Sequence, residues 1–166
     1  MNPAHLHLIA NHVPIFAAAL AIPLLGVSLW RRDESGTFLT AVLFLVIAGV
    51  GAIVAERSGH AAEEIVEELP GIEERLIHEH EERAEVALWL TLASAALGIA
   101  TLALVWRRRP FPVWSAVLLL VASLVTTGAM AWTSLAGGEI RHPEIRASAS
   151  DLSDHHDDHD DHDDDD

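Results

Sequence analysis

The sequence predicts an all-α integral membrane protein, folded as an antiparallel four-helix bundle. Of its 166 residues 51% are hydrophobic, and the mean hydropathy is +0.28. Four apolar runs, about residues 6–30, 38–55, 86–106 and 112–135, are each long enough for a helix to cross a ~30 Å hydrocarbon core. We expect residues 1–146 to form this membrane domain. Residues 147–166 are an Asp/His-rich, low-complexity tail that we expect to be disordered.

The first two apolar runs carry proline and glycine at informative positions. Asn2 and Pro3 are typical of a helix start, because Asn caps a helix and Pro suits its first position. Pro14 and Pro23 each remove a backbone donor, so we expect bends in the first span. The second span contains the small-residue segment 48–52, which allows close contact with a neighbouring helix.

A Glu-rich connection, residues 56–85, separates the second and third spans. It contains eleven Glu, three His and three Arg. Pro70 and Gly71 divide it into a short extramembrane helix, about residues 60–69, and a second helix that begins near Ile72. We expect the second helix to continue unbroken into the third span, so that its first turns project from the bilayer.

The arginines predict the orientation of the bundle. Half of the ten lie in the two short links, before the second span and before the fourth: Arg31, Arg32, Arg107, Arg108 and Arg109. By the positive-inside rule these links face the cytoplasm. Both termini and the Glu-rich connection then lie outside. All five tryptophans fall near a predicted interface, as expected of aromatic belts: Trp30, Trp89, Trp106, Trp114 and Trp132.

Composition excludes several classes of protein. The net charge is -15, and the last sixteen residues hold ten of the 25 acidic residues, so a nucleic acid partner is not expected. The absence of Cys excludes disulfides, thiolate metal sites, iron–sulfur clusters and covalently bound c-type haem. The N-terminus lacks the basic segment of a cleavable signal peptide, so we expect the first apolar run to be retained. We find no phosphate-binding glycine loop, nucleophile elbow or other catalytic constellation that identifies an enzyme.

The eleven histidines all fall on the predicted outer side. Every helix brings at least one imidazole to that surface, and a bundle lined from facing helices is a common cofactor site. His5 and His12 share a helical face, whereas His7 points roughly opposite. We expect His12 to face the bundle, because an unpaired polar group two turns into a span is costly.

This convergence predicts a redox cofactor, b-type haem or a metal, at the outer face. Neutral imidazoles from two helices are usual axial ligands of non-covalent haem. The pairs that we predict are His12 with His80, on helices that can sit diagonally, and His60 with His142. Such a protein would pass electrons between a quinone-linked or cytochrome-containing membrane complex and an external carrier.

Two other hypotheses stay open. The first is a divalent-metal-binding membrane protein, since the i,i+4 spacing of His60 and Glu64 places an imidazole beside a carboxylate. Its predicted mixed N/O site draws on six residues: His5, His12, His60, Glu64, His80 and Glu85. Four tail histidines among the Asp residues also suit metal capture: His155, His156, His159 and His162. The other hypothesis is a structural accessory subunit that docks a larger complex through its acidic outer face. Assembly into a homo-oligomer also stays open.

Three segments resemble a known family: HLHLIANHVPI, GHAAEEIVEELPG with LIHEHEERAE, and GGEIRHPEI. They are similar to bacterial four-span membrane proteins catalogued as domain of unknown function 2231, over about residues 4–146. Members often begin with a His-Pro and a His-Phe-Pro-Ile pattern, which maps here to His5 and to residues 12–15. In this chain Leu6 follows His5, and Val13 stands where Phe is usual. The resemblance implies the four-span fold in a bacterial inner (cytoplasmic) membrane, with both termini on the periplasmic side. The cytochrome c-like domains joined to some relatives imply a redox setting.

Overall fold

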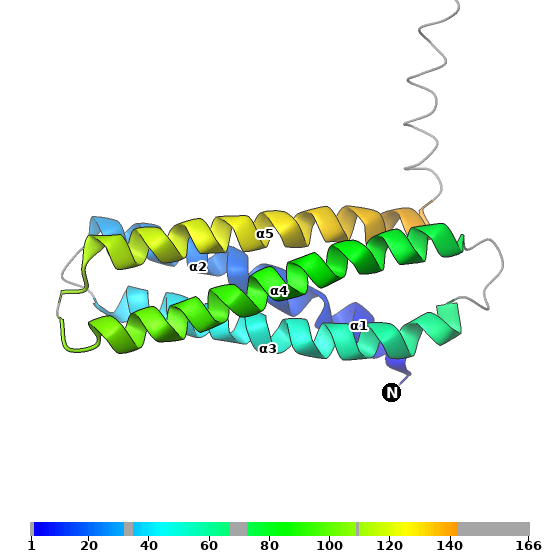
Figure 1. The fold of residues 1–166 in the computed structure, drawn as a ribbon, viewed down its shortest axis with the longest axis horizontal. Helices are drawn as coiled ribbons and strands as arrows, with labels where there is room; N and C mark the ends of the chain where they lie inside the picture. Colours follow the sequence, from blue (N-terminus) through cyan, green and yellow to red (C-terminus); the bar gives the residue numbers. More distant parts are fainter. Residues whose placement is uncertain (1, 32–34, 67–72, 109, 143–166) are drawn as a thin grey trace, which may run out of the picture.

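The computed structural model describes residues 2–31, 35–66, 73–108 and 110–142, and in these ranges all regular structure is α-helical. The elements are α1 (Pro3–Ala10), α2 (His12–Trp30), α3 (Ser35–Val66), α4 (Glu74–Val105) and α5 (Val113–Arg141). Figure 1 shows the helices as long rods lying side by side, with the end of α2, the start of α3, the end of α4 and the start of α5 together at one end. Each rod packs on the next around the ring, α2 on α3, α3 on α4, α4 on α5 and α5 on α2. The predicted antiparallel four-helix bundle is confirmed.

The surface of this bundle suits a lipid environment. Four helical stretches are long and apolar enough to cross a membrane: Pro3–Trp30, Ser35–Glu63, Glu74–Val105 and Val113–Arg141. Large apolar side chains point outward along them, including Leu20, Leu104 and Leu124. The five tryptophans are also exposed, which fits rings placed at the two interfaces. These are the features of a multi-pass membrane protein.

The first span is two helices, α1 and α2, divided at Asn11. Asn2 caps α1 as expected, with its side-chain oxygen accepting from the Ala4 N–H at 2.9 Å. Pro14 has no N–H to donate, and its ring crowds the carbonyl of Ala10, four residues earlier. Ala10 is the last residue of α1. The interruption therefore falls one turn before Pro14, whereas Pro23 is accommodated inside α2. Pro14 itself is buried against α3, where a Cβ on Gly51 would lie only 3.2 Å from Pro14 Cδ.

Helices α3 and α4 have 32 residues each, so each is ~48 Å long at 1.5 Å per residue. This length exceeds a ~30 Å hydrocarbon core, and the excess carries the Glu-rich sequence at the end away from the links. The second helix of the connection does run unbroken into the third span. The short helix predicted for residues 60–69 is not a separate element, because residues 60–66 continue α3. Pro70 and Gly71, the predicted divide, lie outside the described residues, as does the tail.

Small and hydroxylated side chains hold the rods together. A Cβ on Gly49 of α3 would lie 3.0 Å from the Ala95 Cβ of α4, so the two backbones approach closely. Ser94 and Thr126 share a 2.7 Å hydrogen bond between α4 and α5. At the link end, Phe38 is fully buried and its ring lies 4.6 Å from that of Phe111. The packing fixes the rotation of each helix and so decides which polar side chains meet at the opposite end.

Candidate functional site

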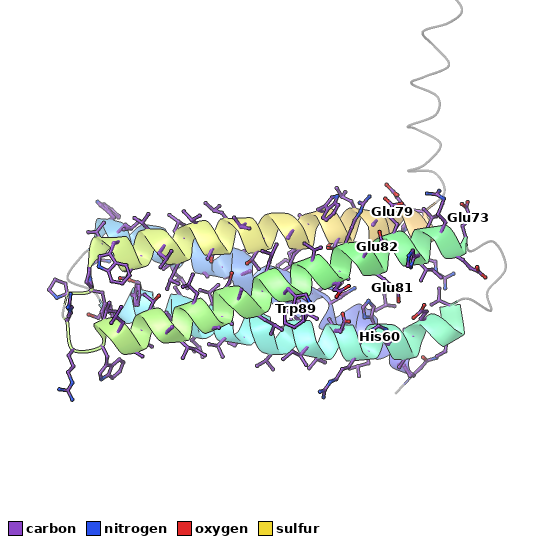
Figure 2. All side chains as sticks on the ribbon, viewed as in Figure 1. His60, Glu73, Glu79, Glu81, Glu82 and Trp89 are labelled. Atoms are coloured by element: carbon purple, nitrogen blue, oxygen red, sulfur yellow. The ribbon has the colours of Figure 1, made fainter. Side chains whose placement is uncertain are left out.

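A cluster of histidines and glutamates lies at the end of the bundle opposite the links. It is built from the start of α1, the end of α3, the start of α4 and the end of α5, which meet at that end (Figures 1 and 2). Two arrangements stand out. One is a group of one imidazole and two carboxylates between α3 and α4, and the other is a pair of imidazoles set against neighbouring helices.

The first arrangement consists of His60 and Glu63 on α3 and Glu81 on α4, which we call the outer triad. One potential ligand atom from each lies within 4.8 Å of the others. His60 Nδ1 is 4.0 Å from Glu63 Oε2 and 4.0 Å from Glu81 Oε1. Figure 2 shows His60 and Glu81 facing the gap between α3 and α4. The side chains are 66%, 30% and 36% exposed, so an ion from solvent has direct access.

A fourth residue, Glu56, orients the imidazole of the triad. His60 Nε2 lies 3.0 Å from Glu56 Oε1, one helical turn earlier on α3. A carboxylate accepts and does not donate, so Nε2 of His60 carries the proton. In the neutral ring Nδ1 then presents its lone pair to Glu63 and Glu81. A carboxylate that orients a histidine in this way is a common companion of metal-binding histidines.

The two carboxylates of the triad also approach each other. One carboxylate oxygen of Glu63 and one of Glu81 lie within 4.8 Å of each other, and His60 Nδ1 is 4.0 Å from both side chains. Two carboxylates in such contact repel unless a proton or a cation lies between them. The outer triad therefore concentrates negative charge and lone pairs at one point.

The second arrangement is a pair of half-buried histidines, His7 on α1 and His80 on α4. His7 Nδ1 lies 2.9 Å from the Ala55 carbonyl oxygen of α3, and His80 Nδ1 lies 3.1 Å from the Thr133 carbonyl oxygen of α5. Each ring also packs on a glycine of the helix that accepts its hydrogen bond, Gly59 for His7 and Gly137 for His80.

His12 does not lie where the sequence placed it. Its ring is exposed and stacks on Phe16 with ring centroids 6.2 Å apart, and its Nδ1 lies 2.9 Å from the Leu8 carbonyl oxygen of the preceding turn. The expectation that His12 faces the bundle is wrong. The reason is that His12 is the first residue of α2 and its Nδ1 is already paired with the Leu8 carbonyl oxygen, so the ring needs no partner inside the bundle. The inward-facing histidine of this segment is His7.

The remaining predicted residues are spread over the same end. His5, Glu85 and His142 are exposed, and His142 follows the last residue of α5. The side chain of Glu64 and the four tail histidines lie outside the described part of the chain. Of the residues predicted from sequence, His60 belongs to the outer triad and His80 belongs to the pair of half-buried histidines.

Sequence reasoning missed Glu56, Glu63, Glu81 and His7. Glu56 lies four residues before His60 and Glu63 three residues after it, so both are on the same helical face, a spacing visible in the sequence. Glu81 was not predictable in this way, because its contact with α3 depends on how α3 and α4 are rotated against each other.

The fold and this cluster define a four-helix, multi-pass membrane protein with a histidine- and glutamate-lined polar end. No protein-family model, curated protein or solved structure matches the chain. What the polar end does must therefore be argued from its own chemistry.

Proposed function

We propose that the protein binds a divalent transition-metal ion at the outer end of its bundle, through His60, Glu63 and Glu81. The observation that carries the proposal is the convergence of one imidazole nitrogen and two carboxylates within 4.8 Å. Ligands ~2.1 Å from a tetrahedral ion lie about 3.4 Å from one another, so the 4.0 Å separations need only a small inward movement.

The chemistry of the donors selects the kind of ion. Imidazole with carboxylates suits Zn²⁺, Fe²⁺, Mn²⁺ or Ni²⁺, and the chain has no Cys to favour a softer metal. Three protein ligands leave at least one coordination position for water or another ligand. Glu56 orients the His60 ring by accepting a hydrogen bond from Nε2–H.

A protonated His60 paired with carboxylates is the competing explanation for the same geometry. It accounts less well for Nδ1, which lies 4.0 Å from both Glu63 and Glu81, beyond normal hydrogen-bonding distance. A divalent ion bound between Nδ1 and the two carboxylates accounts for these separations.

We propose the bacterial inner membrane as the location, with both termini and the metal site on the periplasmic side. The support is the distribution of Arg, five of which lie in the links at the opposite end of the bundle. The tail histidines, on the same side as the site, would gather metal ions near it. A membrane complex that exchanges metal or electrons remains the proposed partner.

Titration of the full-length protein in lipid nanodiscs with Zn²⁺ tests the proposal. The matched variant is His60→Gln, whose amide nitrogen can still donate to Glu56 but which has no counterpart of Nδ1. We expect Zn²⁺ affinity at the strongest site to fall at least tenfold in His60→Gln and in Glu63→Gln. The control is Glu82→Gln, which removes an exposed carboxylate next to Glu81 and should bind as the wild type does. All four proteins carry serine at the four tail histidines, so that the tail does not mask the site, and equal binding by all four would refute the outer triad as a metal site.

A further inference from the structure

The outer triad lies beside the last turns of α5. Its Glu81 is next to His80 in the sequence of α4, and the His80 ring packs on Gly137 of α5, where an added Cβ would lie 3.0 Å from His80 Cε1. Gly137 is five residues before His142, which is ~8 Å of helix at 1.5 Å per residue. Figure 1 shows the end of α5 beside the start of α4, on which it packs. The chain that follows α5 therefore begins near the triad.

The segment after His142 carries four imidazoles within reach of the triad. Thirteen residues lead from His142 to His155, the first of the four. A chain of this length spans at most about 43–47 Å when it is fully extended. Because α5 packs on α4 and α4 packs on α3, the segment has one helix diameter, ~10–12 Å, to pass before it meets His60. The tail histidines can therefore reach the outer triad of their own chain.

Charge keeps this segment away from the triad unless a cation is present. Residues 56–85 hold eleven Glu against three Arg, and the last sixteen residues hold ten Asp and no Arg. Two acidic regions of this kind repel each other once they come within the ~8–10 Å over which salt leaves charges unscreened. A divalent ion on the triad compensates the charges of Glu63 and Glu81. Association of the tail with the triad thus depends on the metal.

A metal on the triad has a position for one more donor, and imidazole is the donor that fits. One imidazole and two carboxylates occupy three positions, and a tetrahedral ion has a fourth. A third carboxylate would make the centre negative, because the two charges of the ion already match those of Glu63 and Glu81. A neutral imidazole adds a good ligand without adding charge. The exposed side chain of His60 leaves the site open to such a ligand from outside the bundle.

We propose that the C-terminal segment folds back when the outer triad holds a divalent ion, and that a tail imidazole completes the coordination. The proposal rests on the triad being a metal site, and it names the partner of that site as a segment of the same chain. An ion captured by the tail passes to the triad by ligand exchange: one imidazole stays bound, and the other tail donors leave as the triad ligands bind. Tethering gives that imidazole an effective concentration on the order of 1 mM, so docking needs no second molecule.

The Zn²⁺ affinities of four full-length proteins, each in nanodiscs with one molecule per disc, test the proposal. They are the wild type, His60→Gln, a variant with serine at the four tail histidines, and the combination of both changes. If tail and triad bind independently, the strongest site of the wild type is only as strong as the better of the two single changes. If the tail completes the triad, we expect the strongest wild-type site to be at least tenfold tighter than that of either one.

Spin-label distances show whether the tail moves onto the triad. Nitroxides are attached at Glu82→Cys, beside the triad, and at Ser153→Cys, two residues before His155; the wild-type chain has no Cys. We expect one equivalent of Zn²⁺, which is diamagnetic, to shift the distance between the labels to shorter values and to narrow its distribution. The shift should be lost in His60→Gln and in the serine variant.

The matched control for the tail is Asp157→Asn combined with Asp158→Asn. It keeps all four tail imidazoles and removes two neighbouring carboxylates, so the labels should shift as they do in the wild-type background. Loss of the shift in this control would contradict docking through imidazole, because tail carboxylates would then be the ligands.

Two further results overturn the proposal. One is a wild type whose strongest site is no tighter than that of the better single change. The other is a label distance that Zn²⁺ leaves unchanged, or changes equally in His60→Gln. The serine variant separates this proposal from the one on which it rests. If the triad binds no Zn²⁺ in that variant, the metal site fails and docking fails with it; if the triad binds Zn²⁺ there and the tail of the wild type does not move, only docking fails.

Discussion

Glu56 Oε1 lies 3.0 Å from Nε2 of His60, on the side of the ring that faces away from Glu63 and Glu81. This hydrogen bond makes Nδ1 the acceptor nitrogen and aims it at the two carboxylates. The imidazole is exposed, and this hydrogen bond holds it in one orientation.

Removing the charge of Glu56 should weaken metal binding without abolishing it. In Glu56→Gln a neutral amide replaces the acceptor carboxylate, so the proton on His60 Nε2 and the ring orientation are less well fixed. We expect the Zn²⁺ dissociation constant to rise about 10- to 100-fold, the range found when outer partners of metal-binding histidines are changed. Calorimetric titration in nanodiscs measures this change. An unaltered constant would mean that Glu56 has no part in orienting the ligand.

Acidification should release the metal from the outer triad. His60 Nδ1 and the Glu63 and Glu81 carboxylates must all be deprotonated to coordinate, so metal and protons compete for the same lone pairs. Affinity is therefore highest at neutral pH and falls as pH is lowered. Zn²⁺ titrations at several pH values, run in parallel on wild type and His60→Gln, isolate this dependence. If the difference in Zn²⁺ affinity between wild type and His60→Gln is the same at every pH, the predicted competition between metal and protons is wrong.

Adding a methyl group at Gly137, against which the His80 ring packs, should destabilise the bundle. In Gly137→Ala the new methyl group would lie 3.0 Å from His80 Cε1, so the ring must move and its bond to the Thr133 carbonyl must lengthen. We expect a loss of about 1–3 kcal/mol, the usual cost of overpacking. Thermal unfolding in detergent, followed by circular dichroism, gives the comparison.

The control for this prediction is Gly128→Ala on the same helix. Nothing lies within 4 Å of a Cβ at Gly128, so this substitution should be neutral or should stabilise α5 by up to about 1 kcal/mol through helix propensity. Equal thermal stability of the two variants would show that His80 does not depend on the glycine beneath it.

The orientation can be tested with single cysteines, because the chain has none of its own. We expect Glu82→Cys at the polar end to react with a membrane-impermeant maleimide added to intact spheroplasts. Gly36→Cys, at the link end, should react only after the membrane is permeabilised. Both positions are exposed, so access to the reagent depends on the side of the membrane alone. The reverse labelling pattern would place the metal site in the cytoplasm.

Part of the candidate site could be predicted from sequence, and the rest could not. The gathering of histidines at one end follows from their positions relative to the apolar runs, which the chain order alone provides. The partner of each histidine depends on helix rotation. Glu81 meets His60 because α3 and α4 pack with Gly49 against Ala95, and no spacing along either helix contains that information.

The sequence by itself determined that this protein has four apolar helices, that its charge lies at their ends, and that a Glu-rich connection joins the second apolar run to the third. These properties depend on local hydropathy and chain order, which need no tertiary contacts. Only the tertiary structure decided that His7, not His12, turns inward. The reason is physical: Pro14 interrupts the first span at Asn11, and the close packing of Pro14 on Gly51 then sets the face that each segment presents to the bundle.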